Sequence, residues 1–204
     1  MTEQDGKKEK IIEVALKRFS HFGIEKTTMN DIADDLNISK ASLYYYFPDK
    51  NSLFLEVAIS ILSDQLEKQQ KSLENANSIP EGLMQMIEAR LAFAEQFHMM
   101  RIQDLQIDYF YKDKRFIELR EKIREKETVI IEHFLDAGIE RGELRELDAE
   151  KTAVTLNDIF MGIGISRLHI CSGPNSLELS KEVVDSIRNS LKDVIDLIYN
   201  GIKK

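Results

Sequence analysis

The sequence predicts an all-α protein of about nine helices, in which a small three-helix N-terminal domain precedes a larger helical domain. Apolar residues recur at helical spacing through most of the 204 residues, and only three prolines and nine glycines interrupt them. We find no internal repeat and no convincing alternation of apolar and polar residues of the kind that marks a β-strand. The chain is long enough to bury a substantial core.

The composition argues against several classes of protein. The formal net charge of -8 disfavours nonspecific affinity for a polyanion. The longest apolar run, Ile159 to Ile165, is far shorter than the roughly 20 residues of a membrane span, so no membrane role is indicated. The single cysteine, Cys171, cannot form an internal disulfide, and the first residues lack the apolar run of a signal peptide. We therefore expect a cytoplasmic protein.

Residues typical of helix ends divide the beginning of the chain. A helix over Lys7–Phe22 is followed by Gly23, where a left-handed terminating residue belongs. Thr28 and Asp31 have the spacing of a capping box, with Asp in place of the usual Glu or Gln. This box predicts a second helix over Met29–Leu36.

A tight turn at Asn37–Ser39 follows the second helix. Ser39 can cap a third helix, which Pro48 ends after about two turns because the residue before a proline disfavours helical dihedrals. Asp49 can cap a long fourth helix over about residues 49–74.

The remaining helices follow the same rules. Ser78 with Glu81, and Pro80 in the first turn, predict the start of a fifth helix that runs to about Phe97. Further periodic segments lie near residues 101–112, 114–141, 149–171 and 177–201.

The predicted third helix has two unlike faces. With Leu43 placed inward, Phe47 lies one turn later on the same face and Tyr46 lies beside them. Ala41 and Tyr45 then point the opposite way. A short helix with small and hydroxyl-bearing residues on its exposed face, after a helix and a tight turn, is suited to the DNA major groove.

We predict that this face contacts double-stranded DNA. The small side chain at position 41 permits close approach to base edges, and tyrosine hydroxyls can reach phosphate oxygens and set the register. Threonines at the start of the second helix and a lysine at the start of the fourth would hold further phosphates. The predicted DNA-binding residues are Thr27, Thr28, Lys40, Ala41, Ser42, Tyr44, Tyr45 and Lys50.

Three segments occur in one order and spacing: Phe22-Gly23-Ile24, then Thr27-Thr28-Met29-Asn30-Asp31-Ile32-Ala33, then Leu36 to Lys50 with Leu53. Together they resemble the DNA-binding domain of the TetR/AcrR family of bacterial repressors, and the resemblance covers about residues 7–56. A common form of the family has Gly at the position of Ala41 and His at that of Tyr45 or Tyr46. These differences leave the operator sequence open.

The resemblance implies a ligand-responsive transcriptional regulator rather than an enzyme. Such a protein is most often a repressor that binds a palindromic operator as a homodimer and is released by a small apolar effector. Residues 1–50 would bind DNA, a helix over about residues 49–74 would link the domains, and residues 51–204 would bind the effector and dimerise. Effector binding would move the linking helix and change the spacing of the two reading helices. No cofactor is implied.

The charge of the reading domain opposes this interpretation. Residues 1–56 contain eight Lys/Arg and ten Asp/Glu, a net charge of -2. We expect Asp31, Asp34 and Asp35 to lie away from the phosphates, and Lys40 and Lys50 to lie towards them. The affinity for DNA should fall strongly with salt.

The last two predicted helices carry apolar residues at the spacing of a helix–helix seam. A single short reading helix contacts few base pairs, so a two-fold dimer is expected, and Gly162 and Gly164 would allow close approach of helices. The alternative is a seam packed within one chain. The predicted interface residues are Ile159, Ile163, Val184, Ile187, Leu191, Val194 and Ile198.

Methionine and aromatic residues concentrate in the middle helices, where they suit an adaptable apolar cavity with a few polar groups that orient a ligand. The alternative is that most of them are ordinary core residues. The predicted ligand-binding residues are Phe93, Phe97, His98, Met100, Tyr109, Phe134 and Phe160.

Two rival functions remain open. Glu95 and His98 have the Glu-x-x-His spacing of di-iron bundles, but we find no second pair, so no catalytic metal is predicted. Asp104 and Asp108, one turn apart, leave a regulatory divalent metal near His98 possible. A helical protein-interaction adaptor is the other alternative, although the third helix lacks the large apolar anchors that a protein groove would require.

Overall fold

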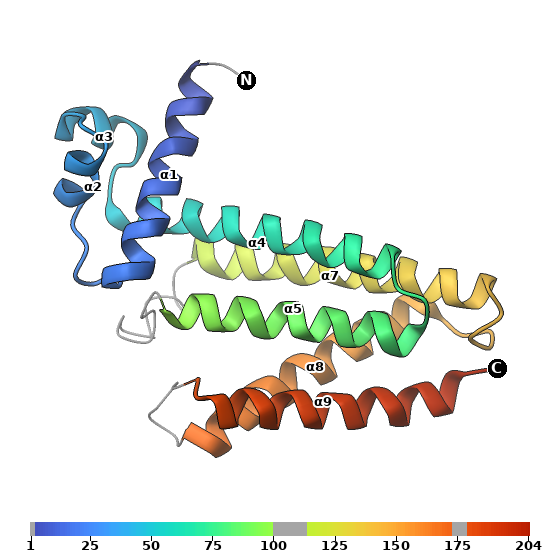
Figure 1. Ribbon diagram of the computed structural model, residues 1–204. Helices are drawn as coiled ribbons and strands as arrows, with labels where there is room; N and C mark the ends of the chain where they lie inside the picture. The colour runs from blue at the N-terminus through green and yellow to red at the C-terminus, as the bar shows by residue number, and fades with distance from the viewer. Residues whose placement is uncertain (1–2, 100–113, 173–178) are drawn as a thin grey trace. The chain divides into compact units, whose positions relative to one another are not determined.

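The computed structural model describes residues 3–99, 114–172 and 179–204 (Figure 1). These residues form eight α-helices and no strand, which confirms the all-α prediction. The predicted segment at 101–112 lies outside the described residues. The helices are α1 Glu3–Phe22, α2 Met29–Asp35, α3 Lys40–Tyr46, α4 Lys50–Glu74, α5 Ile79–Met99, α7 Lys114–Glu140, α8 Ala149–Ser172 and α9 Lys181–Ile202.

The short N-terminal helices begin and end where local side-chain chemistry predicts. Gly23 follows α1 with a φ of 80°, and Asn37 in the turn after α2 has a φ of 52°, both in the left-handed region. The Ser39 hydroxyl accepts a hydrogen bond from the backbone N–H of Ser42, 3.1 Å away, and caps α3. The Asp49 carboxylate accepts one from the Ser52 N–H at 2.6 Å and caps α4. These predicted boundaries are confirmed.

The chain packs as two compact units. The first contains the described residues of Met1–Asp64 and Glu95–Leu119, and the second contains Gln65–Ala94 with those of Arg120–Lys204. The predicted assignment of residues 1–50 to DNA binding and 51–204 to effector binding and dimerisation concerns function and stays a prediction. Among the described residues, no helix is long and apolar enough to cross a membrane.

Aromatic side chains form the centre of the first unit. The rings of Phe19 in α1 and Phe54 in α4 meet edge-on with their centroids 5.9 Å apart, and both are fully buried. Leu43 and Phe47 are buried in the same unit, together with Ile32 of α2. The core therefore draws on α1, α2, α3 and the start of α4.

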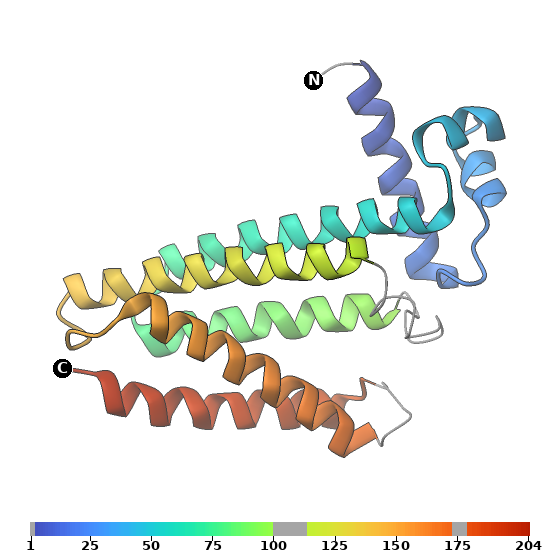
Figure 2. The same cartoon turned by 180° about the vertical axis from the view of Figure 1, so that it is seen from behind.

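The second unit is built from the end of α4, most of α5, α7, α8 and α9. Its α8 and α9 lie side by side in both views (Figures 1 and 2). Packing is tight where α5 meets α7, since a Cβ added at Gly82 would lie 2.3 Å from Phe134 Cζ. A side chain larger than hydrogen at that position would require the ring to move.

Candidate functional site

The rotation of α3 about its axis decides which side chains it exposes. Leu43 and Phe47 are buried, whereas Tyr44 is 47% and Tyr45 72% exposed. Ala41 is also exposed. The predicted division into a buried and an exposed face is confirmed.

Other side chains of α3 lie near this exposed face. Lys40 is exposed and Ser42 is half-buried. Tyr46, predicted in the core, is half-buried, and its ring meets that of Tyr45 edge-on with centroids 5.3 Å apart. This edge-on contact limits the freedom of the Tyr45 side chain.

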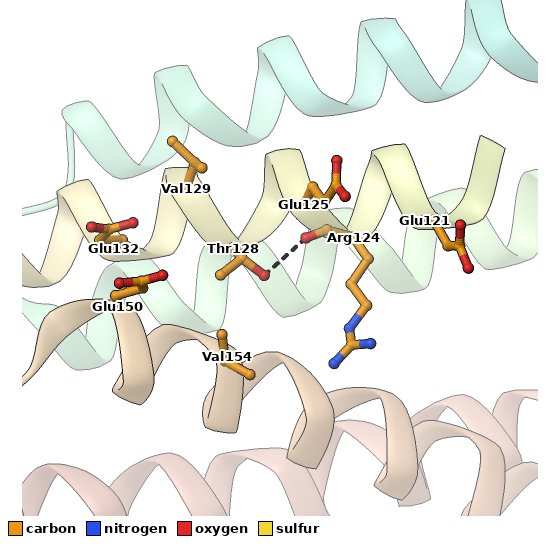
Figure 3. Close-up of a pocket in the computed structure, with 8 residues that line it drawn as sticks. All are labelled: Glu121, Arg124, Glu125, Thr128, Val129, Glu132, Glu150 and Val154. Carbon is orange, nitrogen blue, oxygen red and sulfur yellow. Dashed lines mark hydrogen bonds between the residues drawn. The ribbon is translucent and has the colours of Figure 1, made fainter. Parts of the chain in front are cut away.

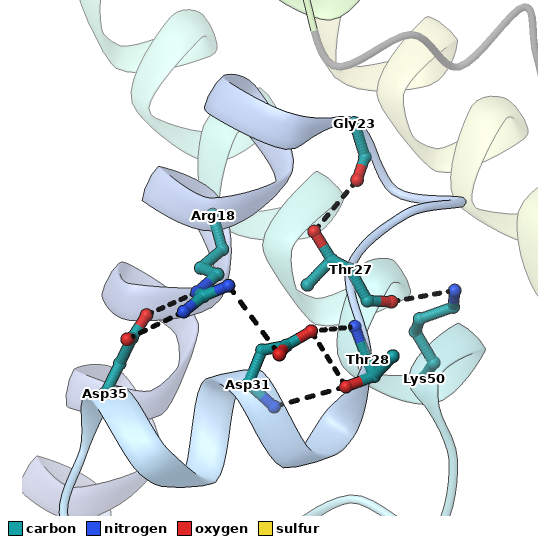
Figure 4. A network of polar contacts seen from close by, with 7 residues as sticks. All are labelled: Arg18, Gly23, Thr27, Thr28, Asp31, Asp35 and Lys50. Atoms are coloured by element: carbon teal, nitrogen blue, oxygen red, sulfur yellow. Dashed lines mark hydrogen bonds and ion pairs between the residues drawn. The ribbon is translucent and has the colours of Figure 1, made fainter.

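The two predicted threonine anchors differ in their surroundings. Thr27 is buried and its hydroxyl donates to the carbonyl oxygen of Gly23 at 2.8 Å, so the prediction that this hydroxyl holds a phosphate is wrong. Thr28 is exposed and caps α2. Its hydroxyl and its backbone N–H both donate to Asp31 Oδ2 at 2.8 Å (Figure 4). The predicted capping box is confirmed, and these bonds lower the pKa of the Asp31 carboxyl.

Lys50 is a structural residue in this arrangement. Its Nζ donates to the carbonyl oxygens of Ile24, Glu25 and Thr27 at 2.8, 3.2 and 3.0 Å, which uses the three N–H donors of an ammonium group. Figure 4 shows the bond to Thr27. Partial burial lowers the pKa of the Lys50 ammonium. The side chain ties the loop between α1 and α2 to the start of α4, and the phosphate contact stays a prediction.

Arg18 neutralises part of the acidic surface of α2. Its guanidinium donates to both carboxylate oxygens of Asp35, at 2.5 and 2.9 Å, and lies 3.8 Å from Asp31 Oδ1 (Figure 4). The hydrogen bond lowers the pKa of the Asp35 carboxyl and raises that of Arg18. Sequence spacing carries no signal for this role of Arg18, because the pair joins residues on different helices.

A surface groove lies between α7 and α8 in the second unit (Figure 3). Its volume is about 360 Å³, and it is lined by four glutamates, Thr128, two valines and Arg124, which pairs with Asp158 at 2.7 Å. None of the predicted ligand-binding residues lines it. Its charged lining does not suit the apolar effector expected from the sequence.

A second cavity, of about 220 Å³, lies among α5, α8 and α9 and is mostly apolar. Phe160, one of the predicted ligand-binding residues, contributes to its wall. The lining residues are Ile87, Arg90, Leu91, Ala94, Phe160, Met161, Gly164, Ile165, Leu179, Ile187 and Leu191.

The other predicted ligand-binding residues do not line this cavity or cannot be placed in it. Phe134 packs in the core against Gly82, and Phe93 is half-buried; both lie outside the lining, and their contacts with a ligand stay predictions. Only the helical backbone of Phe97 and His98 is described. Met100, Tyr109 and Asp108 lie outside the described residues. Across the described ranges, no group of three or more His, Cys, Asp or Glu side chains is arranged to hold a metal ion.

Arg90 is the one cation in the lining of the apolar cavity. Its Nη2 lies 2.6 Å from Asn157 Oδ1 and 3.0 Å from Glu127 Oε2, so it joins α5 to α8 and α7. Burial lowers the pKa of Arg90 and raises that of Glu127. The sequence contains an indication of this site. Arg90 lies three residues after Ile87 and four before Ala94, so a charged residue falls on the apolar face of the helix.

The predicted dimer seam is mostly internal to one chain. Val184, Ile187 and Leu191 are buried against helices of the second unit, so their prediction as interface residues is wrong and the alternative of an intrachain seam holds for them. These three residues follow one another at intervals of three and four positions, and this spacing marks the face of α9 that packs against the core of its own chain. Half-buried residues that also pack against this core are Ile159, Ile163, Val194 and Ile198.

The N-terminal geometry, in which two short helices joined by a tight turn expose a face of small and hydroxyl-bearing residues, defines a helix-turn-helix DNA-binding protein. Residues 11–57 match the sequence model of the family described as bacterial regulatory proteins, tetR family. The HTH-type transcriptional regulator YhgD of Bacillus subtilis (strain 168), itself uncharacterized, is 26% identical over 77% of this chain and 82% of its own length.

Two further comparisons cover different parts of the chain. The biofilm operon icaADBC negative regulator IcaR of Staphylococcus aureus (strain Newman) is 51% identical over 23% of this chain and 25% of its own. The crystal structure of a transcriptional regulator from Cytophaga hutchinsonii ATCC 33406 has a TM-score of 0.82 and 27% identity, and it covers 98% of this chain and 100% of that one. Residues 11–57 are thus similar to the DNA-binding domain of TetR-family regulators, and the proteins that resemble the chain over most of its length are named as transcriptional regulators.

The roles of Lys40 and Lys50 can be separated by salt dependence. We expect Lys40→Met to weaken DNA binding and to reduce the slope of log affinity against log salt by about one, with unchanged stability, because an exposed lysine can contact one phosphate. Lys50→Met should instead lower the unfolding temperature, because three carbonyls lose their donor, and should leave the slope unchanged. Binding isotherms at several salt concentrations and thermal unfolding check both variants. A Lys50→Met variant with an unchanged unfolding temperature and a reduced salt slope would contradict the structural role of Lys50.

Proposed function

We propose that the protein is a repressor that binds a palindromic operator as a homodimer and leaves it when a small apolar effector binds. The exposed face of α3 is the observation behind this proposal. Ala41 and Tyr45 lie on it, and Tyr44 and Lys40 flank them. These residue types suit the major groove, where a small side chain approaches base edges and hydroxyl or ammonium groups reach phosphates.

The homodimer follows from the size of the reading helix. With only seven residues, Lys40–Tyr46, α3 reaches few base pairs, and a two-fold dimer doubles the site and makes it palindromic. The exposed apolar residues of α8 and α9 support a partner there. Leu197 is 73% exposed, and Met161 and Ile165 are more than half exposed.

The effector would occupy the apolar cavity of the second unit. Its lining consists of apolar side chains and one polar side chain, Arg90, which is the composition expected of a small-molecule site. The helix α4, Lys50–Glu74, begins in the first unit and ends in the second. We expect α4 to have one position that allows DNA binding and one that does not. A ligand that binds the second form more tightly would lower the DNA affinity, at most by the ratio of its affinities for the two forms.

A charge on the reading face should abolish operator binding. Ala41→Glu places a carboxylate where the phosphates and base acceptors of the duplex lie, and we expect affinity to fall by about 10- to 100-fold or more. The operator would first be selected from fragments of the source genome. Ala92→Glu is the matched control, because Ala92 is exposed on α5 and its change should leave DNA binding intact. Equal affinity of both variants would contradict the assignment of the face.

A charge at Leu197 should dissociate the dimer. We expect Leu197→Glu to raise the dimer dissociation constant by about tenfold or more, because an exposed leucine in an interface would be replaced by a desolvated carboxylate. Analytical ultracentrifugation measures the change. Val129→Glu, at an exposed valine of α7, serves as the control and should remain dimeric. A monomeric wild-type protein, or a Leu197→Glu variant as dimeric as the control, would exclude this interface.

A further inference from the structure

The first turns of α1 reach the exposed face of α3. The side-chain amide Nε2 of Gln4 donates to the hydroxyl oxygen of Tyr45 at 3.4 Å, and both side chains are exposed. Both residues belong to the same compact unit. Because Tyr45 lies on the face that we propose to bind DNA, a duplex in contact with its hydroxyl also lies close to Gln4.

Packing fixes this part of α1 against its neighbours. Ile11 is buried in the core of the unit. One turn earlier, the Lys8 ammonium pairs with Glu56 of α4 at 2.9 Å and lies 5.8 Å from the ring centroid of Phe47, the residue that follows α3. Gln4 lies one further turn towards the start of the helix, on the same side. The contact with α3 is therefore a consequence of how α1 packs.

Lys7 adds a positive charge beside Gln4. It lies three positions after Gln4, where side chains on a helix are neighbours, and it is exposed. Within the described part of the chain, Lys7 forms no ion pair. The acidic residues Asp5 and Glu9 lie two positions before and after it, so at about 3.6 residues per turn they fall on the opposite side of the helix. The Lys7 ammonium is therefore available to a phosphate.

We propose that Gln4 and Lys7 extend the DNA-binding surface beyond the two short helices: Lys7 binds a phosphate at the edge of the major groove, and Gln4 positions the Tyr45 hydroxyl. Two phosphate strands border this groove, which is about 12 Å wide, so a segment beside the reading helix meets one of them. Both residues precede residues 11–57, which match the family model. The inference rests on the proposed function, since it adds contacts to the same duplex.

Binding isotherms of the full-length protein with its selected operator, at several salt concentrations, test the role of Lys7. We expect Lys7→Met to weaken binding by about three- to tenfold and to reduce the slope of log affinity against log salt by about one, because fewer counterions are released. Lys17→Met is the matched control, since Lys17 is an exposed lysine of the same helix about 15 Å further along. Its slope should equal that of the wild-type protein.

Ethylation interference locates the phosphate directly. Ethylation removes the charge of one phosphate at a time, so each phosphate that the protein needs shows as a position where binding is lost. We expect Lys7→Met to lose one such position in each half-site and to retain the others, whereas Lys17→Met should retain them all.

A double-mutant cycle tests the role of Gln4. Gln4→Ala should weaken operator binding by about two- to fivefold, because the Tyr45 hydroxyl loses the amide that holds it. In a Tyr45→Phe background the same change should have no further effect, since no hydroxyl remains to be positioned. Equal losses in both backgrounds would overturn the positioning role of Gln4.

The outcomes separate this inference from the proposed function. Equal salt slopes and equal interference patterns for Lys7→Met and Lys17→Met would overturn the phosphate contact, even if Ala41→Glu abolishes operator binding as the proposed function requires. A reduced slope for Lys7→Met together with normal binding by Ala41→Glu would support the contact from α1 and contradict the role of α3. A wild-type protein that binds no duplex would overturn both.

Discussion

The orientation of α3 depends on the burial of Leu43 and Phe47, which lie one helical turn apart. Full burial of such side chains contributes about 1.5–3 kcal/mol each, so a rotation that exposed them would be costly. Ser39 caps the helix at its start, and the helix stops at Tyr46, before Pro48. The length and rotation of α3 are thus both fixed, and the exposed face with Ala41 and Tyr45 is a consequence of this packing.

An acidic chain can present such a face because its charges are paired locally. Arg18 binds Asp35 through two hydrogen bonds and lies near Asp31, and Lys8 pairs with Glu56 at 2.9 Å. These contacts reduce the repulsion that the net charge of -2 over residues 1–56 suggests, although exposed pairs are individually weak. The local field at the exposed face then depends more on Lys40 than on the overall charge of the chain.

The sequence predicted what depends on local chemistry. The cap at Thr28, the left-handed Gly23 and the exposed side of α3 follow from residues within a few positions of one another, and the structure has them as predicted. Contacts between distant residues could not be predicted in this way. Lys50 binds carbonyls about 25 positions earlier, and Arg90 meets Asn157 across 67 positions. The spacing on α9 was correctly read as a seam, but periodicity does not distinguish an internal partner helix from a second chain.

Photo-crosslinking from matched aromatic positions tests most directly whether α3 is the reading element. Phe22 and Tyr44 are each 47% exposed, and both belong to the first unit. A benzoylphenylalanine introduced at Tyr44 or Tyr45 should form covalent adducts with bases or sugars of the selected operator duplex, whereas the same group at Phe22 should not. Adducts from Phe22 and none from either tyrosine position would contradict the account.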